Sequence, residues 1–258
     1  MSAEPVSTSI EGRRIIVTGA GNGLGLAIAQ RLARGGAKLL LADRDPVVLD
    51  RAHTEEFPKG SVRAIVKDLA HADAAPVVFD AALAALGSVD ALINNAAWSL
   101  HKPILEMTVA EFDELIAANQ RAPYFLAQEF YRHVSQGATK PRDPAIVNIG
   151  SVNALVGNPN LIAYTGTKGA LVSMTRSMAV EMMGVRVNCI NPGLIDTPMA
   201  RKVFEDGALD PTTIFDKYLI QRMAKMEEIA ELVAYLLSPA AAYITGANWT
   251  IDGGYTVR

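Results

Sequence analysis

Short, nearly continuous apolar runs alternate with longer segments of helical periodicity along most of the chain. The runs occupy residues 14–18, 38–42, 62–66, 91–93, 145–149 and 185–190. Apolar runs without polar alternation are typical of strands that are buried on both faces of a parallel sheet. Between the runs, apolar residues recur at helical spacing, as in Leu24, Ile28 and Leu32. The alternation predicts right-handed βαβ units, and therefore an α/β fold with helices on both faces of a mostly parallel sheet.

No linker or low-complexity segment divides the 258 residues, so we expect one domain over 1–258. The stretch from about residue 193 to 226 breaks the strand–helix rhythm. It is polar and contains Pro198, Gly207 and Pro211. Because ligands of open parallel sheets bind at the carboxyl ends of the strands, we expect residues 193–226 to be a segment that covers the substrate.

Charge and composition exclude several classes of protein. The net charge of -3 gives no basic surface for nucleic acid, and no apolar run approaches the ~18 residues that span a bilayer. The first residues lack the charged and apolar regions of a secretory signal. The single cysteine, Cys189, allows no internal disulfide and no cysteine-rich metal site, and we expect it to be a small buried side chain. We therefore expect a cytoplasmic protein with no metal and no nucleic-acid or membrane partner.

A glycine-rich turn, TGAGNGLG, follows the first predicted strand and precedes a predicted helix. Glycines allow a tight turn and a close approach of the backbone to a pyrophosphate, which then lies at the helix N-terminus. The spacing here is G-x-x-x-G-x-G rather than G-x-G-x-x-G. The turn predicts a dinucleotide site that is formed by Gly19, Asn22, Gly23, Leu24 and Gly25.

Asp43 ends the second predicted strand, eighteen residues beyond Gly25. A carboxylate at this place accepts hydrogen bonds from the adenosine ribose and repels a 2′-phosphate, which favours NAD over NADP. Arg44 follows directly and offers a partner for a 2′-phosphate, so NADP stays open as the less favoured cofactor. The other interpretation of Asp43 is a helix cap.

Tyr164 and Lys168 are four residues apart, and Ser151 lies thirteen residues before the tyrosine. Four residues make one helical turn, so both side chains leave the same helix face. An ammonium beside a phenol stabilises the phenolate and lowers the phenol pKa. The pair could therefore exchange a proton with an alcohol oxygen near neutral pH, although an exposed helix can carry the same spacing by chance.

These motifs, taken together and in this order, resemble the short-chain dehydrogenase/reductase family over essentially the whole chain. Further matching features are Asp68-Leu69, the run NNAA at 94–97, Asn119, the run NPG at 191–193 and the tail ITGANWTIDGGY. The resemblance implies a Rossmann-type doubly wound domain with a seven-stranded sheet. It also implies a homotetramer that packs through helices near 111–132 and 164–183. Two residues depart from the family pattern, because Ala97 and Gly166 stand where glycine and alanine are usual.

The resemblance also assigns roles to individual residues. Ser151 would place the substrate oxygen, Tyr164 would take the hydroxyl proton, and Lys168 would lower the Tyr164 pKa and bind the nicotinamide ribose. Asn119 would bend its helix and hold a water that links Lys168 to solvent. The remaining cofactor contacts would come from Asp68 and Leu69 near the adenine, Asn95 near the cofactor, and Ile195 and Thr197 near the nicotinamide carboxamide and phosphates. The cofactor itself would take or give the hydride.

The substrate is the least constrained part of this hypothesis. By position we expect Trp98, Asn153 and Asn158 to line the pocket, with Ser99, His101, Val152 and Leu194 around them. An aromatic ring with amides suits a sugar, a polyol or a small hydroxylated ring, unless these side chains only bond the local backbone. The expected activity is NAD-dependent interconversion of a secondary alcohol and its ketone or lactone.

Three other functional classes were weighed against this hypothesis. An NADPH-dependent 3-oxoacyl reductase would use the same residues, but Asp43 speaks against it. A non-catalytic dinucleotide sensor is the other alternative, and the intact set of Asn119, Ser151, Tyr164 and Lys168 speaks against that. A hydrolase is disfavoured because neither G-x-S-x-G nor H-E-x-x-H occurs in the chain.

Overall fold

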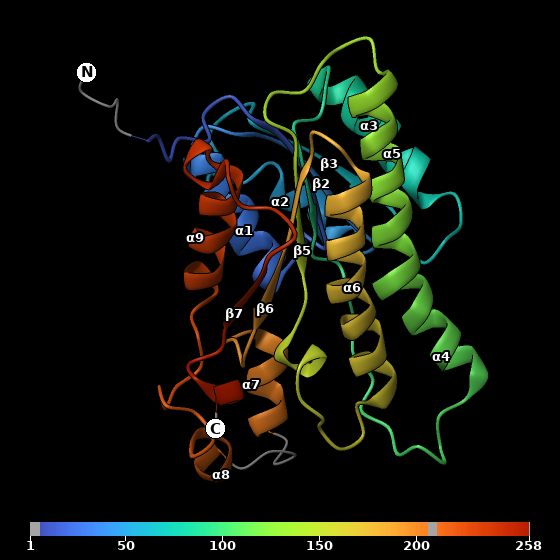
Figure 1. The fold of residues 1–258 in the computed structure, drawn as a ribbon, viewed down its shortest axis with the longest axis vertical. Coiled ribbons are helices and arrows are strands. Elements are labelled where there is room, and N and C mark those ends of the chain that lie inside the picture. Colours follow the sequence, from blue (N-terminus) through green and yellow to red (C-terminus); the bar gives the residue numbers. More distant parts are fainter. Residues whose placement is uncertain (1–5, 206–210, 258) are drawn as a thin grey trace.

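The computed structural model describes residues 6–205 and 211–257, and its strands form one sheet in which every pair is parallel (Figure 1). The strand order is β3-β2-β1-β4-β5-β6-β7. The strands are β1 (Arg14–Thr18), β2 (Lys38–Asp43), β3 (Val62–Val66), β4 (Ala91–Asn94), β5 (Ala145–Ile149), β6 (Arg186–Pro192) and β7 (Asn248–Ile251). The order reverses between β1 and β4, which is the place where open α/β sheets bind ligands.

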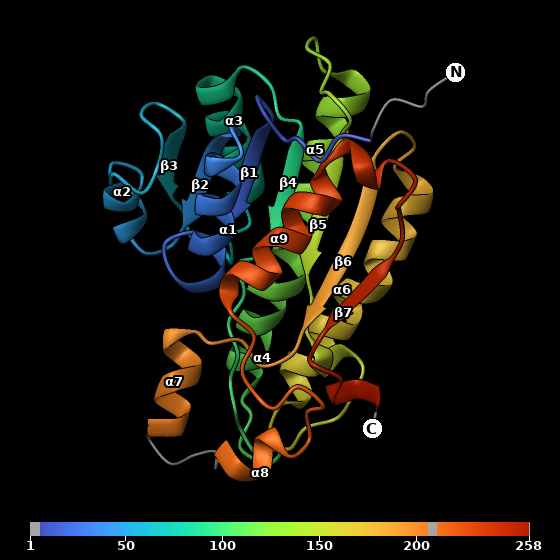
Figure 2. The same ribbon diagram turned by 90° about the vertical axis from the view of Figure 1, so that its left-hand side faces the viewer.

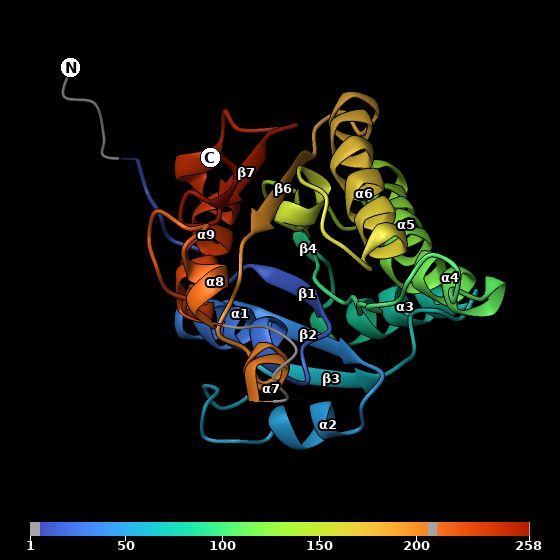
Figure 3. The same ribbon diagram turned by 90° about the horizontal axis from the view of Figure 1, so that it is seen from below.

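Helices cover both faces of the sheet, which confirms the expected doubly wound fold (Figure 3). One face carries α1 (Gly23–Arg34) and α9 (Met226–Leu237), and the other carries α3 (Ala74–Leu86), α5 (Ala122–Gln136) and α6 (Ile162–Glu181). The other helices are α2 (Val47–Arg51), α4 (Val109–Ile116), α7 (Pro198–Glu205) and α8 (Pro211–Phe215). Within the described residues, no helix combines the length and apolar character that crossing a membrane requires.

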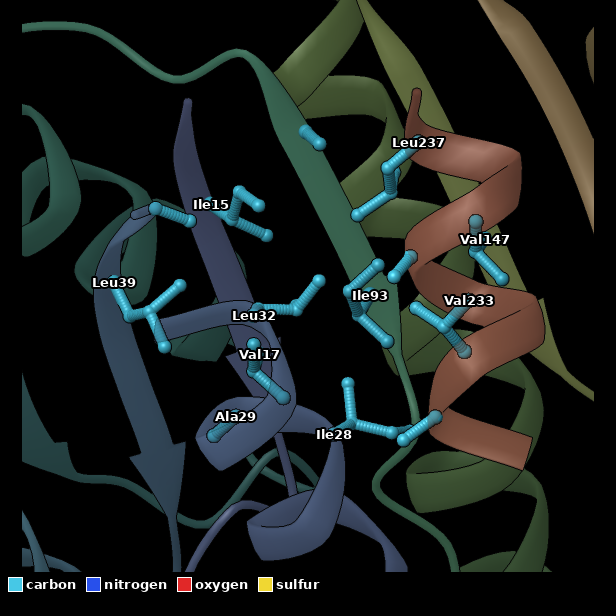
Figure 4. Packing of buried hydrophobic residues seen from close by; sticks show 14 of the residues in the cluster. Ile15, Val17, Ile28, Ala29, Leu32, Leu39, Ile93, Val147, Val233 and Leu237 are labelled. Carbon is cyan, nitrogen blue, oxygen red and sulfur yellow. The ribbon is translucent and has the colours of Figure 1, made fainter. Parts of the chain in front are cut away.

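The apolar core is divided by the sheet into two layers. Because successive strand residues point to opposite faces, Ile15 and Val17 of β1 pack toward α1 and α9, whereas Ile16 packs toward α3 and α5. Figure 4 shows the first layer, in which Leu32 of α1 and Val233 of α9 converge on the sheet. Full burial of each such side chain stabilises the fold by about 1.5–3 kcal/mol.

The six apolar runs of the sequence correspond to β1 to β6, with ends that differ by no more than two residues. The seventh strand, β7, was not located in the sequence. Its residues are half-buried or exposed, and polar Asn248 and Thr250 alternate with apolar Trp249 and Ile251. The strand forms because it pairs with β6 at the sheet edge, from Cys189 opposite Asn248 to Pro192 opposite Ile251.

Two short helices, α7 and α8, lie beyond the carboxyl ends of the strands (Figure 2). They belong to the segment 193–226 that the sequence separates from the strand–helix rhythm, within which residues 206–210, including Gly207, lie outside the described part. The segment is joined to the sheet by a bridge between Ile195 and Ala224. The turn and the helix that follow β1 reach the same edge of the sheet.

Candidate active site

A cavity of about 670 Å³ opens at the carboxyl edge of the sheet. Its walls include every residue that the sequence analysis assigned to the cofactor: Gly19, Asn22, Gly23, Leu24, Gly25, Asp43, Asp68, Leu69, Asn95, Tyr164, Lys168, Ile195 and Thr197. Ser151 and Trp98 line the cavity as well. The structure thus brings residues from most of the chain length to one site.

The glycine-rich turn leaves space where side chains would block the cavity floor. Gly19 has a φ of +64°, and a Cβ built on it would lie 2.7 Å from the Ala96 Cα. A Cβ on Gly25 would lie 1.9 Å from the Gly19 carbonyl oxygen. Asn95 fixes the turn, because its Nδ2 donates to the carbonyl oxygens of Thr18 at 2.9 Å and Gly19 at 3.1 Å.

The N-terminus of α1 faces this turn without a side-chain cap. Asn22 occupies the N-cap position in extended conformation, and its side chain makes no capping hydrogen bond. The first N–H groups of α1 therefore remain available, and they carry the positive end of the helix dipole. An uncapped helix end beside bare glycine backbone fits the pyrophosphate of a dinucleotide.

Asp43 holds the end of β2 against the glycine-rich turn. Its Oδ2 accepts from the Gly21 N–H at 2.8 Å, and its Oδ1 accepts from the Asp45 N–H at 2.9 Å. The carboxylate does not cap α2, whose N-cap residue is Pro46 and has no side-chain cap. Asp43 thus lies at the cavity wall, directly beside the glycine-rich turn.

Two basic residues line the same end of the cavity as Asp43. Arg44 is exposed there, as its place in the sequence suggests. Lys67 follows β3, the strand beside β2, and its Nζ donates to Asp73 Oδ2 at 2.7 Å. Lys67 was not predicted from the sequence. Only the pairing of β2 with β3, in which Asp43 opposes Val66, brings Lys67 beside the acidic residue.

Ser151, Tyr164 and Lys168 form one wall of the cavity. Ser151 follows β5, and its Oγ accepts from the Asn153 N–H at 3.1 Å. Lys168 is 3% exposed, and its Nζ donates to the Ile149 carbonyl oxygen at 2.7 Å. The Lys168 Nζ lies 5.7 Å from the centre of the Tyr164 ring. The helix spacing and the end of β5 therefore place a hydroxyl, a phenol and an ammonium together.

The expectation that Lys168 lowers the pKa of Tyr164 is wrong for this structure. Burial raises the pKa of Tyr164 above its usual value, and the opposing effect comes from a hydrogen bond with Ser151. The ammonium is engaged by the Ile149 carbonyl rather than by the phenol oxygen. Burial also lowers the pKa of Lys168 to about 8, so this side chain is less fully charged than an exposed lysine at that pH.

Asn119 stands behind the cavity rather than on its wall. It lies in a π-helical turn, Ala117–Arg121, between α4 and α5, where the expected irregularity of the helix is found. Its Oδ1 accepts from the Trp98 N–H at 3.1 Å, and its Nδ2 donates to the Trp98 carbonyl at 2.8 Å and to Thr167 Oγ1 at 3.3 Å. The amide thus ties the Trp98 loop to α6.

Among the residues expected at the substrate, Trp98, Ser151 and Tyr164 line this cavity. Asn153 and Asn158 do not line it. Their side-chain amides bond each other instead, since the Nδ2 of Asn158 donates to the Oδ1 of Asn153 at 2.6 Å. The expected neighbours Ser99, His101, Val152 and Leu194 are also outside its walls. Further lining residues, to which the sequence assigned no role, include Ala118, Gly150 and Pro192, and Gly193 and Pro198 come from the segment 193–226.

These features define a dinucleotide-binding oxidoreductase: a bare glycine turn at an uncapped helix, an acidic residue at the next strand end, and a Ser–Tyr–Lys wall. The chain belongs to the short-chain dehydrogenase/reductase family, whose members bind NAD(P)H and act on CH–OH groups. A model of that family, described as enoyl-(acyl carrier protein) reductase, matches residues 19–256.

Curated relatives and solved structures match over nearly the whole chain. Galactitol 2-dehydrogenase (L-tagatose-forming) of Cereibacter sphaeroides is 36% identical, with 96% of each chain covered. L-xylulose reductase of Bos taurus is 34% identical over 95% of this chain and 97% of its own. The structure of 4-hydroxyisoleucine dehydrogenase complexed with NADH has a TM-score of 0.87 at 29% identity, and covers 96% of this chain and 100% of its own.

Proposed function

We propose that this protein is an NAD-dependent oxidoreductase that interconverts a secondary alcohol and its ketone or lactone, the alcohol being a polyol, a sugar or a hydroxylated ring. The observation that carries the proposal is the convergence of Ser151, Tyr164 and Lys168 on the cavity that the glycine-rich turn and Asp43 also line. The relative named for galactitol supports the polyol class.

The cavity offers contacts for each part of a nicotinamide dinucleotide. The glycine-rich turn and the α1 N-terminus would hold the pyrophosphate, and Asp43 would accept from the adenosine ribose. Asp68 and Leu69 would flank the adenine. Ile195 and Thr197 would hold the nicotinamide end. When bound, the cofactor supplies the acceptor or donor of hydride, and the protein orients the reactants.

The chain's own residues handle the proton. Ser151 Oγ already accepts from the Asn153 N–H, so its own hydrogen can be donated, to Tyr164 in this structure and to the substrate oxygen when substrate is bound. In the oxidation direction the Tyr164 oxygen accepts the hydroxyl proton, and in the reduction direction it returns that proton to the carbonyl oxygen. Lys168, protonated below a pKa of about 8, would bind the nicotinamide ribose.

Asn119 completes the catalytic set that we propose, in a supporting role. Its backbone lies in the π-helical turn, where hydrogen bonding departs from the α-helical pattern and a carbonyl can accept from water. A water held there would connect Lys168 to solvent. The Asn119 side chain, engaged by Trp98 and Thr167, fixes the position of this turn.

The preference for NAD rests on Asp43. Its carboxylate would repel a 2′-phosphate, whereas Arg44 and Lys67 on the same wall would attract one. Solved relatives include complexes with NADH and with NADP. We expect Asp43→Ala to reduce the ratio of kcat/KM with NAD to kcat/KM with NADP by about tenfold or more, since about 1.4 kcal/mol is a tenfold change. Steady-state assays with both cofactors measure this ratio, and an unchanged ratio would contradict the assignment.

The assembly and the covering segment are also proposals. The seven strands pair into one sheet, so we propose that residues 1–258 act as one domain. We propose that residues 193–226 cover the substrate, since Ile195, Thr197 and Pro198 line the cavity. Exposed apolar side chains on α4, α5 and α6, such as Phe112, Phe125 and Val180, favour a homotetramer. A buried free Cys189 is in keeping with a cytoplasmic location.

A panel assay tests the proposed function. Purified protein is incubated with NAD or NADP and with galactitol, xylitol, gluconate or cyclopentanol, and formation of the reduced cofactor is followed by absorbance. We expect the highest kcat/KM with NAD and one of these alcohols. Faster reduction of a 3-oxoacyl thioester with NADPH would favour the reductase alternative. Cofactor binding without turnover of any substrate would favour a sensor.

A further inference from the structure

Three successive hydrogen bonds lead from the C-terminal segment to Ser151. The Tyr255 hydroxyl donates to the Oδ1 of Asn158 at 3.1 Å. The Nδ2 of Asn158 donates to the Oδ1 of Asn153 at 2.6 Å, and the Asn153 N–H donates to the Oγ of Ser151 at 3.1 Å. Each residue of the series donates toward the serine, so the last hydrogen in the series is that of the Ser151 hydroxyl.

Tyr255 also contacts the segment that we propose to cover the substrate. Its ring stacks on that of Tyr218, with 4.8 Å between the ring centres and an angle of 30° between the planes. Tyr218 is 5% exposed, and its hydroxyl oxygen accepts from the Leu194 N–H at 3.2 Å. Leu194 stands between Gly193 and Ile195, both of which line the cavity. One tyrosine thus contacts both the 153–158 loop and the covering segment.

We propose that Tyr255 is a positioning residue for the reaction, acting on Ser151 through Asn158 and Asn153. The inference rests on the proposed function, because it concerns the serine that would place the substrate oxygen. Asn158 uses both of its side-chain polar atoms within this series. Asn158 therefore acts as a link to Tyr255, and the loop that carries Asn153 takes its position from the C-terminal segment.

The direction of these hydrogen bonds explains how the Tyr255 hydroxyl affects the hydrogen that Ser151 would donate to the substrate. Ser151 Oγ accepts from the Asn153 N–H, and this orients the serine hydroxyl toward its remaining partner, Tyr164. If the amide of Asn158 turns, the 153–158 loop loses a fixed partner and the serine hydroxyl becomes less well oriented. Loss of orientation at a reacting group lowers kcat more than it weakens cofactor binding.

The test compares Tyr255→Phe with Tyr243→Phe, the same substitution at a tyrosine that is fully exposed on the surface. Tyr255→Phe retains the ring that stacks on Tyr218 and removes the hydroxyl that donates a hydrogen bond to the Oδ1 of Asn158. With galactitol and xylitol as probes, we expect kcat to fall about three- to tenfold, the range for one neutral hydrogen bond. The Kd for NADH should stay at the wild-type value, the free energy of unfolding should fall by no more than about 1.5 kcal/mol, and Tyr243→Phe should retain wild-type kcat.

A double-mutant cycle tests whether the effect passes through Asn158. In an Asn158→Ala background, Tyr255→Phe should change kcat by less than about twofold, because its acceptor is already gone. A full additional loss in that background would overturn the proposed route. So would a Tyr255→Phe protein whose kcat matches the Tyr243→Phe control.

A second measurement needs no substrate and separates this inference from the proposed function. Hydrogen exchange of the backbone amides at 152–160 should be faster in Tyr255→Phe than in wild type and in Tyr243→Phe. If the wild-type protein oxidises none of the alcohols, the proposed function fails, and this exchange measurement still decides the inference. Unchanged exchange at 152–160 would overturn it.

Discussion

Tyr164 is the residue on which the proposed chemistry depends most directly. It lines the cavity beside Ser151, and no other phenol is among the lining residues. We expect Tyr164→Phe to lower kcat by about 10²- to 10⁴-fold, the usual contribution of a general acid or base. The Kd for NADH, followed by fluorescence, should change by less than about threefold. Retained turnover would contradict the mechanism, and loss of NADH binding would show that the substitution damaged the site itself.

The pH dependence of the two reaction directions follows from the state of the same phenol. Burial raises the pKa of Tyr164, so the phenolate fraction near neutral pH is small and grows with pH. Oxidation uses the phenolate and reduction uses the phenol. From about pH 6 to about pH 8, kcat/KM should therefore rise for alcohol oxidation and should not rise for ketone reduction. Initial rates in both directions test this, and oxidation that slows across that range would contradict the assignment of the base.

The residue scale also separates what the sequence could predict from what it could not. The glycine-rich turn and Asp43 were predicted from local context, as a turn and a strand end, and the other cofactor residues were expected from the family resemblance. Lys67 was missed because its place at the cavity depends on the pairing of β3 with β2. The roles of Asn153 and Asn158 depend on Tyr255, 97 residues beyond Asn158 in the chain. The direction of the Tyr164 pKa depends on burial, which helix spacing alone does not measure.

At the scale of elements, five of the six predicted strands have both faces buried. Burial on both faces favours apolar residues, so β1, β2 and β4 to β6 stand out as largely apolar runs, whereas β3 is only partly buried. Strand β7 lies at the sheet edge and keeps polar Asn248 and Thr250, so no such run marks it. The irregular turn around Asn119 was expected only from the family resemblance, because nothing in its apolar spacing announces a π-helical turn.

Substitution by alanine should have opposite consequences at Gly25 and at Gly166, since it should damage the site at Gly25 and stabilise the fold at Gly166. A Cβ on Gly25 would lie 1.9 Å from the Gly19 carbonyl oxygen, so Gly25→Ala must displace the turn. A Cβ on Gly166, within α6, meets nothing within 4 Å. We expect Gly25→Ala to weaken NADH binding by at least about tenfold, because the turn can no longer approach a pyrophosphate. We expect Gly166→Ala to stabilise the protein by about 0.5–1 kcal/mol, because alanine favours the helix.

Fluorescence titration with NADH and urea unfolding of both variants test these expectations. Each variant is the control for the other, since both add one methyl group to a helix. Wild-type NADH affinity in Gly25→Ala would contradict the proposed cradle for the pyrophosphate. A Gly166→Ala protein that is less stable than wild type would show that its methyl group meets an obstacle, for example at a subunit interface.

At the scale of the whole molecule, the two ends of the parallel strands differ in function. The cavity lies at the carboxyl ends of the strands, and a cluster of charged side chains lies at their amino ends. Asp143, just before β5, accepts from Arg13 at 3.0 Å and from Arg186 at 3.0 Å. The two guanidinium groups also donate to carbonyl oxygens at the end of α9, Leu237 at 2.6 Å and Leu236 at 2.7 Å. This cluster joins the starts of β1, β5 and β6 to the C-terminus of α9, where the helix dipole favours cations.

The charge of Asp143 should therefore matter for stability and not for catalysis. Arg13 and Arg186 are 3% and 8% exposed, so Asp143→Asn leaves two largely buried cations without their carboxylate. Because Asp143 itself is about a third exposed, we expect a loss of about 1–3 kcal/mol, below the range for a fully buried pair. Urea unfolding measures the loss. Asp80→Asn, at an exposed position of α3, is the control and should change stability by less than about 0.5 kcal/mol.

The same carboxylate gives the stability a defined response to acid. Burial alone would raise the pKa of Asp143, but the hydrogen bonds and charges of Arg186 and Arg13 outweigh it and hold the pKa below its ordinary value of 3.8. The stabilisation is therefore present above that ordinary value and is lost as the pH falls through the lower pKa of the folded state. Asp143→Asn should be less stable than wild type at neutral pH, and the difference should shrink below about pH 4. The kcat of Asp143→Asn should equal that of wild type, since the charged cluster and the cavity lie at opposite ends of the strands. A stability difference that persists unchanged in acid would show that the side chain acts through its shape rather than its charge.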